Sequence, residues 1–253
     1  MTLTIFCNLG GIHRMKTLSR FAAIFSLTAF FIAPSFAWAD SPAALEARIL
    51  DSKRVLDEIM VAPDVSIPEE MLGKAKAIAI YPNVLKAGFI FGGRFGKGVV
   101  SAKDASGNWS PVSFSTLGGG SWGLQIGGQA TDLILVIMNE RGLNGLLSNN
   151  FKLGADASVA AGPVGRQTEA GTDLTLSSGI LAYSRNRGLF AGVSFDGVVL
   201  TQDNHSNSAY YGKLVTSRDV LTGGAVGAQP SSKPLLDALT EYAKRWEKRL
   251  AGA

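Results

Sequence analysis

The sequence has little of what catalytic and metal-binding sites are usually built from. Its 253 residues include one cysteine, Cys7, and two histidines, His13 and His205. One cysteine forms no internal disulfide, and isolated histidines make poor transition-metal sites. Charged residues are also few, at 17%, whereas 46% of the residues are hydrophobic, which excludes a disordered chain and predicts a globular core. We therefore expect no metal ion and no cofactor.

Most of the excess of basic residues comes from the start of the chain. The whole sequence carries a formal charge of +4. Residues 1–39 contain Arg14, Lys16 and Arg20 and no acidic residue, which leaves a charge of +1 for residues 40–253. Because nucleic-acid-binding proteins carry a concentrated positive surface, this balance argues against a nucleic-acid partner.

The first 39 residues have the pattern of an N-terminal extension followed by a secretory signal peptide. Lys16 and Arg20 form a positive region, residues 21–33 are apolar, and Ala37-Trp38-Ala39 is a small-residue cleavage pattern. The apolar stretch is shorter than the roughly 20 residues that cross a bilayer. We therefore expect cleavage after Ala39 and a periplasmic or secreted product, with no lipobox cysteine to anchor it.

The rest of the chain predicts a single domain of the α+β class. Helical patterns are expected over residues 42–60, 69–75, 139–148 and 217–221, and from Ser232 towards the C-terminus. Short segments rich in β-branched and aromatic residues predict strands at residues 77–81, 88–102, 109–116, 122–126, 132–138, 155–161, 173–184, 189–195 and 198–201. The predicted fold is a β-rich antiparallel sheet or barrel-like core with amphipathic helices at both ends and one short internal helix.

One short motif raises the possibility of catalysis. Residues 119–123 fit the G-x-S-x-G nucleophile elbow, with Ser121 as the nucleophile and a later aspartate and His205 in the order of a hydrolase triad. However, the elbow requires a helix after the nucleophile, and paired glycines lead here into a predicted strand. The same stretch fits a dinucleotide fingerprint but lacks the surrounding βαβ unit. We expect no enzyme, with a serine hydrolase as the less favoured alternative.

The segment around His205 is polar and contains Asp203. It predicts an exposed loop, since one histidine with loop carboxamides matches neither a transition-metal site nor a calcium loop.

Basic side chains set among glycines and aromatic residues are the remaining candidates for a binding site. Glycine permits close backbone approach, and arginine binds phosphate groups through two parallel hydrogen bonds. These residues are therefore candidates for contacts with an anionic headgroup, the alternative being ordinary solvated charge: Lys86, Arg94, Lys97, Arg141, Arg166, Arg185 and Arg187.

Several long runs, in order, resemble the SYLF domain family, and the resemblance covers roughly residues 43–250. The runs begin with Tyr81-Pro-Asn-Val-Leu-Lys-Ala-Gly-Phe and the Gly-Gly-Arg-Phe-Gly-Lys-Gly that follows it, and continue at residues 117–132, 151–166, 183–194 and 207–212. With the predicted leader, the chain resembles an exported bacterial member, with residues 40–253 as one SYLF-like lipid-binding domain.

The resemblance implies a lipid-binding module without catalysis. Eukaryotic relatives bind phosphoinositide membranes, partly through an amphipathic N-terminal helix, and some fungal relatives bind actin. For an exported chain the expected partner is an anionic phospholipid, or a similar amphiphile, at a membrane of the cell envelope. The helix at residues 42–60 holds the corresponding place, with Arg48, Lys53 and Arg54 as candidate membrane contacts or, alternatively, as part of a helix that packs on the core. The competing function is a structural or protein-interaction module with an unknown envelope partner.

Overall fold

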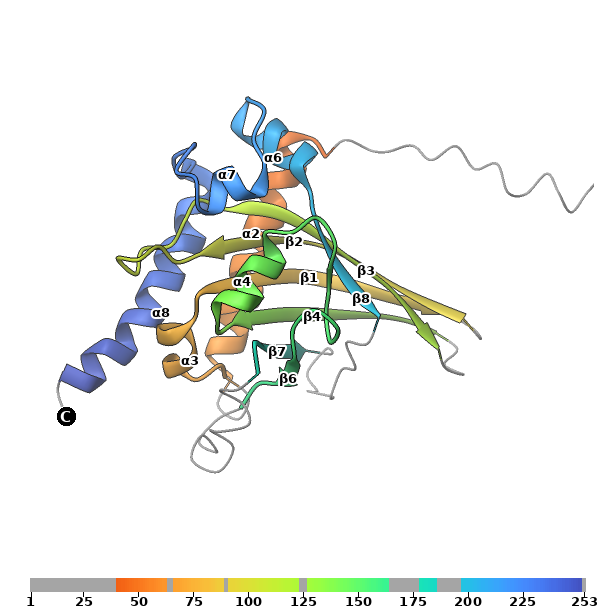
Figure 1. Ribbon diagram of the computed structural model, residues 1–253, viewed down its shortest axis with the longest axis horizontal. Coiled ribbons are helices and arrows are strands. Elements are labelled where there is room, and N and C mark those ends of the chain that lie inside the picture. The colour runs from red at the N-terminus through yellow and green to blue at the C-terminus, as the bar shows by residue number, and fades with distance from the viewer. Residues whose placement is uncertain are drawn as a thin grey trace, which may run out of the picture. The chain divides into compact units, whose positions relative to one another are not determined.

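Eight strands form one curled sheet at the centre of the fold, as the computed structural model in Figure 1 shows. The order across the sheet is β5-β8-β3-β2-β1-β4-β7-β6. Every neighbouring pair is antiparallel except β6 and β7, which are parallel. The predicted α+β fold with a β-rich, barrel-like core is therefore confirmed, with one parallel pair at the edge of the sheet. The strands are β1 (Ala77–Gly88), β2 (Phe91–Ala102), β3 (Ser113–Trp122), β4 (Gly127–Ile137), β5 (Phe151–Lys152), β6 (Val159–Ala161), β7 (Ile180–Arg185) and β8 (Val198–Gln202).

The structure describes residues 40–62, 66–88, 91–122, 127–163, 178–185 and 197–251. The predicted signal peptide and the predicted strand at residues 189–195 lie outside the described residues. The helices are α2 (Pro42–Met60), α3 (Glu69–Lys74), α4 (Glu140–Leu146), α6 (Asn204–Tyr211), α7 (Ser217–Leu221) and α8 (Lys233–Ala251), with a short 3-10 helix, η2 (Pro230–Ser232). Among the described helices, none is long and apolar enough to cross a membrane.

Both faces of the sheet are buried because apolar residues alternate on its central strands. On β1, Ile78 and Ile80 pack into the cluster that includes the apolar residues of α2 and α8. Ala77, Ala79 and Tyr81 face the opposite way, into a second cluster with the leucines of α4. The apolar run of β4 is predicted to form a central strand that is covered on each side. This prediction is confirmed, because residues 133–137 are buried.

The two terminal helices form where their sequence signals predict them. Ser41 caps α2, because its side chain accepts a hydrogen bond from the Ala44 amide at 3.2 Å, and Pro42 occupies the first turn. Leu45, Ile49, Leu56 and Ile59 make its buried stripe. In α8, Leu235 and Leu239 are buried in the same cluster, and Trp246 is partly buried beside Gly73 of α3.

The segment around His205 is helical, so the prediction of a loop is wrong. Asp203 caps α6 by accepting a hydrogen bond from the Ser206 amide at 3.1 Å, and Gly212 ends the helix in a left-handed conformation with a φ of 67°. The buried residues of α6 are Ser206 and Asn207 rather than apolar ones, so the helix has no hydrophobic stripe. His205 itself is exposed, as predicted.

Candidate functional site

The sheet has one end that the helices leave uncovered. The end of β1 and the start of β2, together with the end of β3 and the start of β4, extend past the helices at the right of Figure 1. Gly88 pairs with Gly92 and with Gly127 at this end. We call the described residues 84–88, 91–97, 116–122 and 127–131 the distal end.

Two exposed apolar side chains lie opposite each other at the distal end. Leu85 of β1 and Phe95 of β2 are cross-strand partners, and 57% and 52% of their surfaces are exposed. Residues directly opposite each other on neighbouring strands lie on the same face of the sheet. Phe95 is four residues from the buried Val99, so both side chains lie on the same face of β2. The Leu85–Phe95 pair is therefore on the face that carries α2 and α8. On β3, Phe95 is opposite Gly118, where an added Cβ would meet only open space. The apolar pair therefore faces outwards without a side chain from β3 to cover it.

Two cations occupy the neighbouring position along the same strands. Lys86 is the cross-strand partner of Arg94, so both lie on the face opposite to Leu85 and Phe95. Burial lowers the pKa of Arg94, but arginine starts so high that the guanidinium stays charged at neutral pH. The sequence from residue 83 to residue 131 contains only one acidic residue, Asp104, which is in the hairpin loop away from the distal end. Lys86 and Arg94 are thus the two cations that the distal end carries on this face of the sheet.

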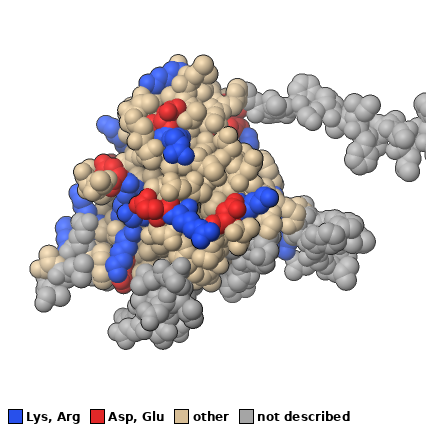
Figure 2. Space-filling model, viewed as in Figure 1, with Lys and Arg blue, Asp and Glu red and all other residues tan. Residues whose placement is uncertain are grey.

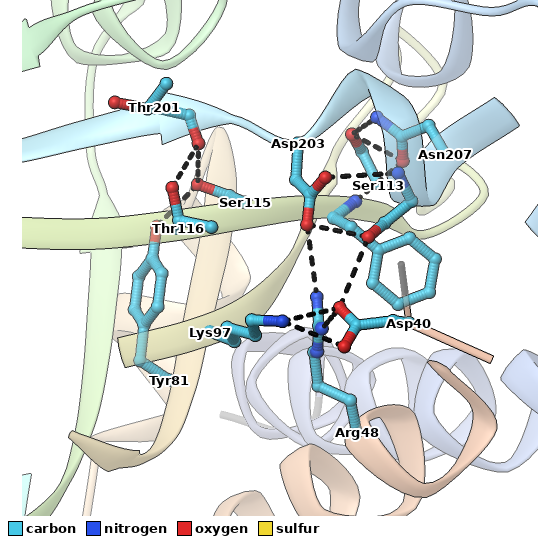
Figure 3. A network of polar contacts seen from close by, with 12 residues as sticks. Asp40, Arg48, Tyr81, Lys97, Ser113, Ser115, Thr116, Thr201, Asp203 and Asn207 are labelled. Atoms are coloured by element: carbon cyan, nitrogen blue, oxygen red, sulfur yellow. Dashed lines mark hydrogen bonds and ion pairs between the residues drawn. The ribbon is translucent and has the colours of Figure 1, made fainter. Parts of the chain in front are cut away.

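Lys97 joins a different group of charges, where α2 meets the sheet (Figure 3). Its ammonium lies 2.8 Å from each carboxylate oxygen of Asp40. Arg48 of α2 also donates to Asp40, and its Nη1 is 3.5 Å from Asp203 Oδ2. The Arg48 guanidinium lies over the Phe114 ring at 5.3 Å from its centroid. We call Asp40, Arg48, Lys97 and Asp203 the ion network.

Three residues of the ion network are largely closed to solvent, whereas 36% of the Lys97 side chain is exposed. The exposed fractions are 8% for Arg48, 15% for Asp40 and 16% for Asp203. Burial acts to raise the pKa of Asp40, but hydrogen bonds from Lys97 and Arg48 and their positive charges outweigh it, so the pKa of this carboxyl is lowered. Asp40 is therefore held ionised, and the network ties the start of α2 to β2 and to the cap of α6.

A neutral network continues from the same corner and fixes α6 on β3. Asn207 is fully buried, and its Oδ1 accepts a hydrogen bond from the Phe114 amide at 2.8 Å. Its Nδ2 donates to Ser113 and Ser217, both at 3.1 Å. All polar atoms of the amide are satisfied, which is what a buried polar group requires. This cluster has the character of a structural anchor.

The described headgroup candidates lie at several separate places in the fold. Lys86 and Arg94 come together at the distal end, whereas Lys97 faces the other side of β2, as alternation on an unbroken strand requires. Arg185 ends β7, where its backbone pairs with Asp132 of β4; its side chain is not among the described ones. Arg141 is exposed on α4, which follows the opposite end of β4. Arg166 and Arg187 lie outside the described residues.

The candidate membrane residues of the N-terminal helix are paired with acids of this chain. Arg48 is buried in the ion network. Lys53 lies 2.5 Å from Asp57, and Arg54 is paired with Asp51 and Glu58 at 3.2 and 3.3 Å. The apolar stripe of α2 is buried against the sheet and α8. In this structure α2 packs on the core, which was the alternative to membrane insertion.

The nucleophile elbow does not form around Ser121. This residue lies inside β3, where its backbone pairs with Gly92 of β2, and β4 resumes as a strand at Gly127. Among the described residues, no group of three histidine, cysteine, aspartate or glutamate side chains is placed to hold a metal ion. The geometry at Ser121 is that of a sheet and not of a strand-turn-helix elbow.

A family model described as "Ysc84: Las17-binding protein actin regulator" matches residues 118–242. Protein YSC84 from Saccharomyces cerevisiae is 36% identical over 200 residues, which are 78% of this chain and 42% of the yeast protein. SH3 domain-containing YSC84-like protein 1 from Homo sapiens is 33% identical over 187 residues, or 73% of this chain and 54% of the human one. LAS seventeen-binding protein 3 from Saccharomyces cerevisiae is 34% identical over 200 residues, or 78% and 43%. The chain therefore spans only about half of each relative's length.

Proposed function

Since this chain belongs to the SYLF domain family, we propose that it is a binding module whose ligand is the surface of an anionic phospholipid membrane. The observation that carries the proposal is the distal end, where the cations Lys86 and Arg94 lie on the rung next to an exposed apolar pair, Leu85 and Phe95. A near-neutral protein gains little from its total charge, so a local cationic and apolar surface is needed to hold it at a membrane.

The charge pattern elsewhere on the surface supports the same location. Figure 2 shows basic and acidic side chains interleaved on the face towards the viewer, not gathered into one basic patch. On α2, Lys53 and Arg54 pair with acids about one turn away, and on α8 Arg245 pairs with Glu241. Such pairs leave little net charge for an anionic surface. The export signal predicted at residues 15–39 would bring the distal end to an envelope membrane, and a mature chain that begins at Asp40 would support this.

We propose that the module acts without catalysis. The strand conformation at Ser121 supports this, because a nucleophile elbow needs a tight turn into a helix. The second candidate function is a protein-binding module, which the description of the matched family as Las17-binding favours. The two candidates differ in whether lipid alone is sufficient for binding.

Sedimentation with vesicles tests the proposed function. The full chain is mixed with phosphatidylcholine vesicles that contain increasing fractions of phosphatidylglycerol. We expect the bound fraction to rise with the anionic fraction and to fall when salt is raised, because exposed charges are screened over about 10 Å at 0.1 M salt. If the chain stays in the supernatant at every composition, lipid binding is wrong and the protein-binding module takes its place.

A further inference from the structure

We propose that the ion network contains a binding site for the phosphodiester group of a phospholipid, and that the carboxylate of Asp40 fills this site in the structure as an internal substitute. The cations of the site are Arg48 and Lys97. This inference rests on the proposed lipid binding for the class of ligand, and it adds a place on the fold for one lipid headgroup. The site is separate from the cation pair of the proposed membrane contact, because Lys97 faces the side of β2 opposite to Arg94.

The Asp40 carboxylate is held in the way that a bound anion would be (Figure 3). Lys97 Nζ lies 2.8 Å from both of its oxygens, and Arg48 donates to Oδ2. The Ser206 hydroxyl, which donates to Asp203 at 2.7 Å, is 3.5 Å from the same oxygen of Asp40. A lysine and an arginine that converge on one oxyanion make the charge-assisted contacts by which proteins bind phosphate groups. The position of the carboxylate therefore marks a site for a small oxyanion.

The charge of the site matches that of a phosphodiester. Without Asp40, the ion network has two cations and one acid, Asp203, which leaves one positive charge to be balanced. A phosphodiester, like a carboxylate, has a single negative charge that is shared by two equivalent oxygens. Arg48 also has a donor to spare, because its Nη1 is buried and makes no hydrogen bond among the described residues. A phosphate group is larger than a carboxylate and has more oxygens, so it is able to accept from this nitrogen as well.

Asp40 can leave the site without unfolding α2. It precedes Ser41, whose side chain caps the helix at the Ala44 amide, so the cap does not involve Asp40. Lys97 is 36% exposed and Arg48 is 8% exposed, so the site opens to solvent on the side of the lysine. An incoming anion would replace the contacts that the carboxylate gives up. The exchange of Asp40 for a lipid phosphate is therefore a local event at the start of the helix.

An exposed apolar surface beside the site favours a lipid over a free phosphate compound. Phe95 is two residues from Lys97 on the regularly paired strand β2, so both side chains lie on the same face, about 7 Å apart along the strand. Phe95 and its cross-strand partner Leu85 are more than half exposed, and an added Cβ at Gly118, opposite Phe95, would meet open space. One phospholipid molecule can therefore place its phosphate at Lys97 and an acyl chain along Phe95 and Leu85.

The test measures how phosphodiesters stabilise the full chain when Asp40 is removed. Asp40→Ala is unfolded by denaturant at constant ionic strength, with rising concentrations of dimethyl phosphate or of dihexanoyl phosphatidylglycerol below its micelle concentration. We expect a saturable rise of the midpoint, with an apparent dissociation constant at least about tenfold lower than in wild type, because wild type must first release its own carboxylate. The lipid should bind more tightly than dimethyl phosphate, and Asp40→Ala with Phe95→Ala should lose that difference.

Asp57→Ala is the matched control on the same helix. It also removes an acid that pairs with a lysine, but the Lys53–Asp57 pair contains one cation instead of two and is about one-third exposed. Neither ligand should therefore raise the midpoint of Asp57→Ala in a saturable way. Asp40→Asn removes the charge with the smallest change in packing, and it provides the same measurement if Asp40→Ala does not fold.

The outcomes separate this inference from the proposed function, because no vesicles are used. If the ligands stabilise the Asp40 variants no more than wild type, or no more than Asp57→Ala, the phosphodiester site is wrong, whatever sedimentation with vesicles shows. If dimethyl phosphate and the lipid bind equally well, the assignment of the site to a lipid is wrong. If the lipid binds as expected but the chain does not sediment with vesicles, the proposed binding to a membrane surface fails and the site stands.

Discussion

Replacing Arg48 with methionine is expected to lower the free energy of unfolding by about 3–5 kcal/mol, because it removes the buried cation between two largely buried carboxylates. Methionine keeps much of the apolar stem, so the loss reports the charge more than the packing. Arg48 donates to Asp40, lies 3.5 Å from Asp203 and covers the ring of Phe114. Chemical denaturation of the full chain measures the effect.

The matched control is Arg54→Met on the same helix. Arg54 is half exposed, and its pairs with Asp51 and Glu58 are surface ion pairs, so the expected loss is below about 1 kcal/mol. If the two variants lose the same free energy of unfolding, the ion network is not what holds the start of α2 on the sheet.

The same network predicts how the stability depends on pH. The pKa of Asp40 is lower in the folded chain than the value of about 3.9 for an unfolded aspartate. A lowered acid pKa stabilises the fold above the unfolded value, and this contribution is lost as the pH falls through the folded pKa. In Arg48→Met the pKa of Asp40 moves back up, because one of its two cations is gone. The difference in unfolding free energy between wild type and variant should therefore narrow as the pH falls below about 4.

Gly98→Ala is expected to destabilise the fold by about 3 kcal/mol, because β1 passes too close to this position for any side chain. A Cβ at Gly98 would lie 2.3 Å from the carbonyl oxygen of Ile80 and 2.5 Å from the Tyr81 ring. Tyr81 is itself fixed, since it is fully buried and its hydroxyl is 2.9 Å from Ser115 Oγ. The backbone of β1 would therefore have to move.

Gly118→Ala is the control, on the strand next to Gly98. An added Cβ at Gly118 meets nothing within 4 Å, so the expected change is less than about 1 kcal/mol in either direction. Denaturant unfolding measures the change in unfolding free energy for both variants. If the two substitutions have the same effect, close packing of β1 on β2 is not the reason for glycine at position 98.

The regular elements were predictable because their local signals agree with their environment. In α2 and α8 an apolar stripe coincides with a capping serine or an early proline, and both helices bury that stripe. The hairpin at residues 104–108 follows its turn sequence, with Gly107 at a φ of 82°. The two-residue strand β5 was not predicted, and among the described α-helices only α6 was not. The buried residues of α6 are Ser206 and Asn207, so its sequence has no hydrophobic periodicity.

The candidate site was only partly predictable, and the reason is a bulge in β1. The register between β1 and β2 shifts between Ile80 and Leu85, where Asn83 has a φ of 50°. Strict alternation from Ile80 would have placed Lys86 on the face that carries α2. The extra residue exchanges the two faces, so that Leu85 lies there instead. Sequence spacing identified Lys86 and Arg94 as candidates but not the apolar pair beside them.

The ion network depends on contacts that no local pattern contains. Asp40, Lys97 and Asp203 come from the start of α2, from β2 and from the cap of α6. They come together only after the sheet has formed, with Asp40 between Lys97 and Arg48, and with Asp203 beside Arg48. Arg48 and Lys97 had been assigned by sequence to membrane or headgroup contacts. Arg48 is buried with acids of the same chain and the half-buried Lys97 pairs with one of them, so in this structure both residues stabilise the fold.

The most direct test of the account compares vesicle binding by two double variants of equal charge. Lys86→Gln with Arg94→Gln removes the cations of the distal end, whereas Lys233→Gln with Lys244→Gln removes two exposed lysines of α8. Each cation near an anionic surface contributes about 1 kcal/mol, so the distal variant should bind phosphatidylglycerol vesicles about thirtyfold more weakly than wild type, and the α8 variant nearly as well as wild type. If vesicle binding is weakened equally in both variants, or in neither, while both variants remain folded, the claim that the distal end binds the membrane is contradicted.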